Sequence, residues 1–146
     1  MATKGLKGNF SHTIDTKGRM IIPSKLRERL GLSFVVTKSL DGCLLLYPVD
    51  EWDKFEKKLE MLPITNKNTR AFKRFFQADA IDITLDSQGR FTVPSTLLEF
   101  AKIKKDIVIV GVGEKAEVWS KEMWDDQDDI DPELLALSIE TLGIIL

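Results

Sequence analysis

Two arginines occupy equivalent places in two copies of a short motif. The pattern Asp-x-x-Gly-Arg is made by Asp15, Gly18 and Arg19, and again by Asp86, Gly89 and Arg90. The planar fork of an arginine donates two hydrogen bonds to phosphate or guanine and keeps its charge at physiological pH. The same spacing also allows each arginine to pair with the aspartate of its own turn and stiffen it. From spacing alone, a contact with a polyanion and a structural ion pair are both open.

The motif lies within an internal duplication with an offset of 71 residues. Residues 15–28 and 86–99 are identical at seven of fourteen positions. After a slip of one residue, Trp52 aligns with Trp124 and Tyr47 with Trp119. Two copies are too few for a solenoid, which buries its core by stacking about three or more repeats. The repeat therefore predicts a pseudo-two-fold pair.

Both copies are expected to use the same elements in the same order. Alternating or apolar runs predict strands at 10–14, 20–22, 34–37 and 43–47 in the first copy and at 81–85, 91–93, 107–110 and 116–119 in the second. Gly18 and Gly89 are expected at positive φ in tight turns that the aspartates form. Asp41-Gly42 is expected to join 34–37 to 43–47 as a hairpin. A short helix follows each second strand, with Ser24 and Ser95 as expected N-caps and Gly31 as a stop.

The remaining segments are expected to be helical or solvated. Asp50 is a candidate cap for a helix whose apolar face is marked by Trp52, Phe55, Leu59 and Leu62 and which Pro63 ends. Further helices are expected at 70–76 and 132–137, whereas residues 125–131 are expected to be unstructured. The predicted organisation has a first repeat at 9–51, a helical connector at 52–79, a second repeat at 80–123 and an acidic tail at 124–146. The fold class is α+β and strand-rich, with short helices.

Composition indicates a small cytoplasmic protein with an uneven charge. The chain has 146 residues, of which 43% are hydrophobic and 30% charged, and no apolar run is long enough to span a membrane. Its N-terminus lacks the apolar core of a secretion signal. Residues 1–120 carry 20 Lys and Arg against 15 Asp and Glu, whereas residues 121–146 carry one lysine against eight acids. A basic body is compatible with a polyanion ligand, and the acidic tail is either a solubilising segment or a competitor for the basic face.

Candidate catalytic and metal sites receive little support from the residues. Cys43 and His12 are the only cysteine and histidine, so an ordinary zinc site is excluded. Cys43 lies in an apolar strand, where a small buried side chain is expected, and His12 lies in an alternating strand. The acidic run 125–131 lacks the glycine and glutamate of an EF-hand loop, because Ile130 and Ala136 stand in their places. The sequence therefore predicts no enzyme, no cofactor and no metal site.

A glycine pattern at 111–116 superficially fits the dinucleotide fingerprint. That motif requires a helix to begin at the glycines, so that its amides face a pyrophosphate. Here Glu117-Val118-Trp119 resumes a strand pattern. A hairpin turn is the expected structure.

Cations are concentrated around the first arginine motif. Lys17 lies within the turn, and Lys25 and Arg27 follow on the expected helix. The second copy replaces these three cations with Gln88, Thr96 and Leu98. The two copies are therefore expected to differ in their contribution to any polyanion contact.

Taken together, these motifs resemble the MraZ family and, more broadly, the DNA-binding fold of the AbrB and SpoVT type. The similarity runs from about Gly8 to Trp124 and rests on both Asp-x-x-Gly-Arg turns and on the segments 43–48, 50–52, 74–76 and 117–119. The resemblance implies two interleaved swapped hairpins that form a pseudo-two-fold barrel. It also implies a ring-shaped homo-oligomer.

The resemblance further implies a bacterial transcriptional regulator that occupies the nucleoid. Such a protein binds double-stranded DNA at repeated promoter boxes of the division and cell-wall gene cluster, often in its own operon. Arg19 and Arg90 would contact DNA, with Lys17 as a neighbour and Lys25 and Arg27 as further basic contacts. No membrane and no small-molecule substrate are expected. Two alternatives stay open, namely a non-catalytic oligomeric scaffold of the same fold and, less favoured for want of a stacking platform, an RNA-binding protein.

Overall fold

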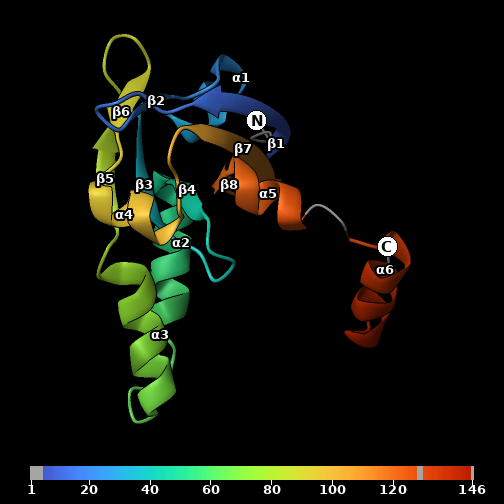
Figure 1. Ribbon diagram of the computed structural model, residues 1–146. Coiled ribbons are helices and arrows are strands. Elements are labelled where there is room, and N and C mark those ends of the chain that lie inside the picture. The colour runs from blue at the N-terminus through green and yellow to red at the C-terminus, as the bar shows by residue number, and fades with distance from the viewer. Residues whose placement is uncertain (1–4, 128–129, 146) are drawn as a thin grey trace.

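The strands of the two copies exchange partners. The computed structural model describes residues 5–127 and 130–145 (Figure 1). Its strands are β1 (Leu6–Thr13), β2 (Arg19–Ile21), β3 (Ser33–Lys38), β4 (Leu44–Pro48), β5 (Ile81–Thr84), β6 (Arg90–Thr92), β7 (Asp106–Gly113) and β8 (Ala116–Ser120). Strand β1 of the first copy pairs with β7 of the second, and β5 of the second pairs with β3 of the first. The interleaved, duplicated and strand-rich α+β fold is thereby confirmed.

The pairing scheme is unchanged when the two copies are interchanged. The hairpin β3–β4 corresponds to the hairpin β7–β8, and both confirm the hairpins that the sequence predicted. On the pseudo-two-fold axis, β4 pairs with β8 and β2 pairs with β6. All of these ladders are antiparallel. Neither copy therefore forms a complete sheet without the other.

The strands do not close into the barrel that we expected. Six of them form one sheet in the order β1-β7-β8-β4-β3-β5, whereas β2 and β6 form a separate two-stranded ribbon. Within residues 5–127 and 130–145, no ladder joins the edge strands β1 and β5. The ribbon is too short to bridge these edges, because each of its strands has three residues and is soon followed by a proline, Pro23 or Pro94, which donates no ladder hydrogen bond.

Helices cover both faces of the sheet. They are α1 (Ser24–Leu30), α2 (Val49–Glu60), α3 (Lys67–Gln77), α4 (Ser95–Phe100) and α5 (Lys121–Gln127). A further helix, α6 (Pro132–Thr141), contributes no residue to either core cluster and lies apart from the sheet (Figure 1). One core cluster joins the sheet to the β2–β6 ribbon and to the helices α1 and α4. In this cluster the rings of Phe34 and Phe91 meet edge to face with their centroids 5.2 Å apart. A second cluster joins the other face to α2, α3 and α5. None of the helices in the described ranges is long and apolar enough to cross a membrane.

The aligned aromatic residues make the same contact in each half. Tyr47 and Trp52 meet edge to face with their ring centroids 5.5 Å apart, and Trp119 and Trp124 do so at 5.9 Å. Each pair attaches the helix after the last hairpin strand to the sheet. The one-residue slip in the alignment is therefore a real feature of the duplication.

Three local expectations need correction. Pro23 and Pro94 occupy the N-cap positions with extended ψ values of 136° and 146°, so Ser24 and Ser95 are already the first helical residues, and neither helix has a side-chain cap hydrogen bond. Helix α2 likewise begins after Pro48, so Asp50 lies in its first turn and is not the cap. The cap at Gly31 is confirmed, with a φ of 85°.

The acidic segment after the second copy is partly helical, contrary to our expectation. Residues 125–127 belong to α5, where Lys121 forms an ion pair with Asp125 one turn away. Residues 128–129 of the same prediction lie outside the described residues. The helix expected at 132–137 is confirmed and extends to Thr141 as α6, whose N-cap Asp131 accepts a hydrogen bond from the Glu133 N–H at 3.0 Å.

Candidate nucleic-acid interface

The two Asp-x-x-Gly-Arg turns have the same hydrogen bonds. Oδ1 of Asp15 accepts from the backbone N–H of Lys17 and of Arg19, both at 2.9 Å. Oδ1 of Asp86 accepts from the equivalent N–H groups, again at 2.9 Å. Gly18 and Gly89 have φ values of 77° and 75°, which a residue with a Cβ rarely adopts. The turns predicted from the motif are therefore present.

Each arginine is held by its own aspartate through a single nitrogen. Nε of Arg19 donates to Oδ2 of Asp15 at 2.7 Å, and Nε of Arg90 donates to Oδ2 of Asp86 at 2.9 Å. Among the residues that the structure describes, the terminal amino groups of both guanidinium groups have no protein partner. The side chains of Arg19 and Arg90 are 32% and 29% exposed. The structural ion pair thus exists, and it leaves the outer donors of each fork available.

The aspartates keep their charge over a wide pH range. The backbone N–H of Arg19 is the largest influence that lowers the pKa of Asp15 below its ordinary value of 3.8, with the Arg19 side chain and the Lys17 N–H adding to it. The same groups of Arg90 and Gln88 lower the pKa of Asp86. At neutral pH each arginine is therefore paired with an ionised aspartate.

The ribbon places the two arginines on one face. In the register, Arg19 lies opposite Thr92 and Arg90 lies opposite Ile21. Met20, in the centre of β2, and the central residue of β6 are buried on the core side of the ribbon. The first and last residues of each strand therefore point to the opposite, outward side. Arg19 and Arg90 are then diagonal neighbours, a relation that puts residues about 7–8 Å apart. Figure 1 shows this ribbon and its turns at one end of the molecule, away from α3.

The other predicted contacts do not share one environment. Lys17 and Lys25 are exposed, the first in the turn and the second on α1. Arg27 is half-buried, and its Nε donates to the Ile22 carbonyl at 2.8 Å. Its guanidinium lies against Gly89 in the turn of the other copy, where a Cβ would come within 2.4 Å of Cζ. The structure thus places Arg27 beneath the second turn, on the side that packs against α1.

The counterpart of Arg27 is apolar. Leu98 occupies the equivalent position on α4 and lies under the first turn, with Cδ1 3.5 Å from where a Cβ on Gly18 would be. Helix α1 of the first copy therefore supports the turn of the second, and α4 supports the turn of the first. No local pattern in the sequence signals this crossed support, because it depends on how the copies interleave.

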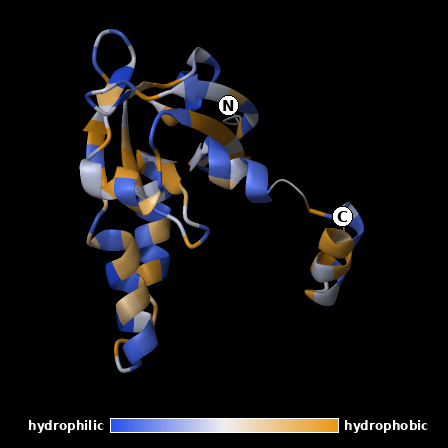
Figure 2. Cartoon of the chain, in the orientation of Figure 1, coloured by the Kyte–Doolittle hydropathy of each residue, from blue (hydrophilic) through white to orange (hydrophobic). Residues whose placement is uncertain are grey.

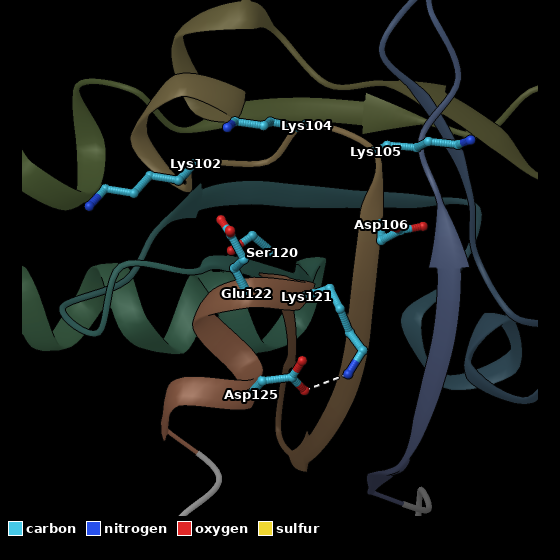
Figure 3. A pocket seen from close by; sticks show the side chains of 8 residues that line it. All are labelled: Lys102, Lys104, Lys105, Asp106, Ser120, Lys121, Glu122 and Asp125. Atoms are coloured by element: carbon cyan, nitrogen blue, oxygen red, sulfur yellow. Dashed lines mark hydrogen bonds and ion pairs between the residues drawn. The ribbon is translucent and has the colours of Figure 1, made fainter.

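A cavity lined by four lysines lies elsewhere. It has a volume of about 280 Å³. Figure 3 shows its lining side chains between the α4–β7 connection and α5. It is lined by Ser120, by the lysines Lys102, Lys104, Lys105 and Lys121, and by the carboxylates Asp106, Glu122 and Asp125. Lys121 is turned toward Asp125 and paired with it (Figure 3). Three carboxylates nearly balance the four lysines of this cavity.

The catalytic candidates have structural surroundings. Cys43 is completely buried and lies 3.0 Å from the Ser39 hydroxyl, and burial raises the pKa of its thiol to about 12. The buried small side chain that the sequence predicted at Cys43 is confirmed. The glycine pattern at 111–116 forms the β7–β8 hairpin, as expected. In the described ranges, no group of three or more metal-ligating side chains is close enough to hold a metal ion.

Comparison with known proteins places the chain in a family. A family profile described as "MraZ protein, putative antitoxin-like" matches the chain twice, at residues 6–75 and 76–135. The chain belongs to the MraZ family. It is 49% identical over 142 residues to the transcriptional regulator MraZ of Caldanaerobacter subterraneus subsp. tengcongensis, covering 95% of this chain and 99% of that one. It is 50% identical over 139 residues to the MraZ regulator of Clostridium tetani, with 94% and 98% covered.

Membership of the MraZ family confirms the resemblance drawn from the sequence. The double match agrees with the duplication that the ladders display, since one copy of the motif lies in each matched segment. Another relative, the MraZ regulator of Clostridium acetobutylicum, is 49% identical over 139 residues, covering 94% of this chain and 98% of that one. The two motifs thus belong to a chain similar to these relatives over nearly its whole length.

Proposed function

We propose that this chain is a DNA-binding transcriptional regulator. Its relatives are named transcriptional regulators, and the placement of Arg19 and Arg90 on the outward face of the β2–β6 ribbon is the observation that carries the proposal. The target would be repeated promoter boxes of the division and cell-wall gene cluster, including the chain's own operon. The protein would work without a cofactor and without catalysis, in the cytoplasm at the nucleoid.

The ion pairs explain why a rigid arginine is effective at this position. Because Nε is bonded to the aspartate, the guanidinium plane is oriented before DNA arrives, and less side-chain freedom is lost on binding. The terminal amino groups then donate to phosphate or to guanine in the major groove. A separation of about 7–8 Å between the two positions corresponds to about two base-pair steps of about 3.4 Å along one strand.

Two arginines and a few lysines are not sufficient for tight binding by one chain. Non-specific contacts of this kind give dissociation constants of about 10⁻⁴–10⁻⁶ M at physiological salt. We propose that several chains assemble into a ring, so that binding of the first box makes the next contacts intramolecular. Such coupling adds about 10²–10⁴ in avidity when the boxes match the spacing of the subunits. Several direct repeats should therefore bind well and a single box poorly.

The test is a fluorescence-anisotropy titration of a promoter fragment over a range of salt concentrations. The wild type is compared with Arg19→Ala/Arg90→Ala and with Lys57→Ala/Lys58→Ala, which removes two exposed charges from α2. We expect a steep salt dependence for the wild type and the control, and its loss in the arginine variant while circular dichroism stays unchanged. If all three proteins bind equally, or if none binds, the arginines are structural and the scaffold alternative takes their place.

A second titration separates the avidity mechanism from the contact itself. Fragments with one box and with several direct repeats are compared at the same salt concentration. We expect the repeats to bind more tightly by more than the number of boxes explains. Equal affinity per box would remove the avidity mechanism and leave the arginine contact standing.

A further inference from the structure

The hairpin of α2 and α3 ends in a loop with exposed apolar side chains, residues 61–66, which we call the tip loop. Inside the hairpin, Leu59 is 1% exposed and Leu62 packs against the second core cluster. On the outside, Met61 is 84% and Ile64 69% exposed. Figure 1 shows the loop at the end of the hairpin that points away from the sheet, and Figure 2 shows hydrophobic and hydrophilic residues side by side there. The fold thus buries two apolar side chains at this end and leaves two in solvent.

Hydrogen bonds within the chain hold the tip loop in one shape. The Thr69 hydroxyl donates to the Pro63 carbonyl, and the Arg70 guanidinium donates to the Ile64 carbonyl at 2.8 Å. The Asn66 side chain caps α3 by accepting from backbone N–H groups of its first turn. Because these polar groups already have partners in the chain, moving the loop out of water leaves fewer of them unsatisfied.

Positive charge surrounds the tip loop. Residues 57–74 include six lysines and arginines and a single acid, Glu60. Four of these cations lie within about one helical turn of the loop and are exposed, namely Lys57, Lys58, Lys67 and Arg70. Among the residues that the structure describes, none of the four forms a salt bridge. Their long side chains can extend beside the loop while their charges stay in water.

An apolar tip among cations has the chemistry of a contact with a bilayer that contains anionic lipids. Met61 and Ile64 would enter the boundary between headgroups and acyl chains, and the cations would meet the phosphate groups. A nucleic acid would satisfy the cations, but its phosphate backbone gives exposed methionine and isoleucine side chains no apolar layer to enter. The combination of both features therefore favours a lipid surface.

We propose that the tip loop and its four neighbouring cations bind the surface of a membrane that contains anionic phospholipids. The contact is peripheral and needs no spanning helix, which is why no membrane partner was expected from the sequence. Figure 1 shows the hairpin and the β2–β6 ribbon at different ends of the molecule, so one chain can hold DNA and a membrane at the same time. The proposal does not depend on the proposed DNA contact.

Cosedimentation with vesicles tests the contact. The vesicles consist of phosphatidylcholine alone or of phosphatidylcholine with phosphatidylglycerol. The wild type should bind the anionic vesicles, less so as salt is raised, and should bind the neutral ones weakly. Met61→Ser/Ile64→Ser and Lys58→Gln/Lys67→Gln should each weaken binding to the anionic vesicles by about tenfold or more.

Matched controls remove similar side chains elsewhere. Leu32→Ser/Leu40→Ser removes two apolar side chains that are each 68% exposed, and Lys104→Gln/Lys105→Gln removes two exposed charges. Both should bind the anionic vesicles as the wild type does, and so should Arg19→Ala/Arg90→Ala. Circular dichroism checks that every variant is folded. A wild type that does not bind the anionic vesicles, or tip variants that bind them like the controls, would overturn the proposal.

Two further readings identify a different occupant. If the wild type ignores the vesicles and Lys58→Gln/Lys67→Gln loses affinity for the promoter fragment, the tip is a nucleic-acid contact and the lipid proposal is wrong. If Met61→Ser/Ile64→Ser lowers the mass measured by light scattering, a second copy covers the tip, and the lipid proposal is wrong as well.

A fluorescent label shows whether the tip enters the bilayer. Cys43 is the only cysteine and is buried, so Ile64→Cys introduces one accessible thiol for an environment-sensitive dye. We expect its emission to shift to the blue on anionic vesicles, whereas the same dye on Leu40→Cys should not shift. Equal spectra with and without anionic vesicles at position 64 would show that the loop stays in water and would overturn the proposal.

Discussion

The two Asp-x-x-Gly-Arg turns have the same backbone and different supports. Both have the same aspartate-to-amide hydrogen bonds at 2.9 Å and the same arginine-to-aspartate pair. The first turn rests on Leu98 and has Lys17 at its tip, whereas the second rests on Arg27 and has Gln88 there. The duplication has thus retained the geometry that orients an arginine and has varied the charge around it. The cationic side chain under the second turn comes from the first copy.

The largest effect expected from this difference concerns DNA binding by single variants. Arg19→Ala should weaken binding to box and scrambled DNA alike and make the salt dependence shallower by about one unit, because the first turn also presents Lys17 to phosphates. Arg90→Ala should mainly reduce discrimination between the two DNAs, by about 1–3 kcal/mol. Anisotropy titrations with both DNAs measure this. Equal losses with the same salt slope would show that the turns contribute identically.

A smaller effect is expected when the turn glycines are replaced. Gly18→Ala and Gly89→Ala should each lower the free energy of unfolding by about 1–2 kcal/mol, because both positions have positive φ. A Cβ at Gly89 would also displace the Arg27 guanidinium from the Ile22 carbonyl. Arg27→Ala should therefore add less to Gly89→Ala than to Gly18→Ala. Denaturant unfolding of the double-mutant cycle tests this, and equal additions would mean that Arg27 does not support the second turn.

Substitutions at the C-terminal ends of α1 and α4 are expected to change the free energy of unfolding by about 1 kcal/mol. Gly31 ends α1 at a φ of 85°, and its counterpart Lys102 after α4 has a φ of 55° despite its side chain. Lys102→Gly should raise the free energy of unfolding by up to about 1 kcal/mol, and Gly31→Ala should lower it by about the same amount. Thermal unfolding of both variants measures the pair. A destabilising Lys102→Gly would show that contacts of the lysine outweigh its backbone strain.

The smallest effect is expected from acid. Because folding lowers the pKa of Asp15 and Asp86 below 3.8, their stabilising contribution is complete above that pH and is lost as the pH falls through the folded-state pKa. The variant Asp15→Asn/Asp86→Asn should have a lower free energy of unfolding than the wild type at neutral pH. It should lose less of that free energy than the wild type as the pH falls below 4. Melting curves over this range test the difference. Parallel pH profiles for the two proteins would contradict it.

Much of this fold could be predicted because its signals are local. The aspartate and glycine of each turn, the hairpin around Asp41-Gly42 and the stop at Gly31 depend on side chains within a few residues, and the structure confirms them. The duplication also predicted a pseudo-two-fold pair, and the structure places the ladder between the equivalent strands β2 and β6 on that axis. The capping serines were wrong for an equally local reason, because the preceding proline already occupies the cap.

The remaining features depend on contacts between copies. From the sequence, Arg27 is indistinguishable from an ordinary surface arginine. Only the packing of α1 under the turn of the other copy places its guanidinium against Gly89. The sequence could not predict whether the sheet closes into a barrel, because closure depends on whether the edge strands β1 and β5 meet. The outer donors of Arg19 and Arg90 could be proposed from the motif. Their arrangement side by side required the register of β2 and β6.

The exchange of strands has a consequence for synthesis. Leu6 pairs with Gly113, so β1 leaves the ribosome more than a hundred residues before the far end of its partner strand β7. Pairing over such a separation makes folding slow, since a long loop must close before its contacts stabilise the chain. Until residues 81–84 have emerged, the edge of β3 that pairs with β5 is unpaired as well. At high expression, nascent chains can therefore complete each other's sheets, and the yield of correctly paired protein should fall as the rate of synthesis rises.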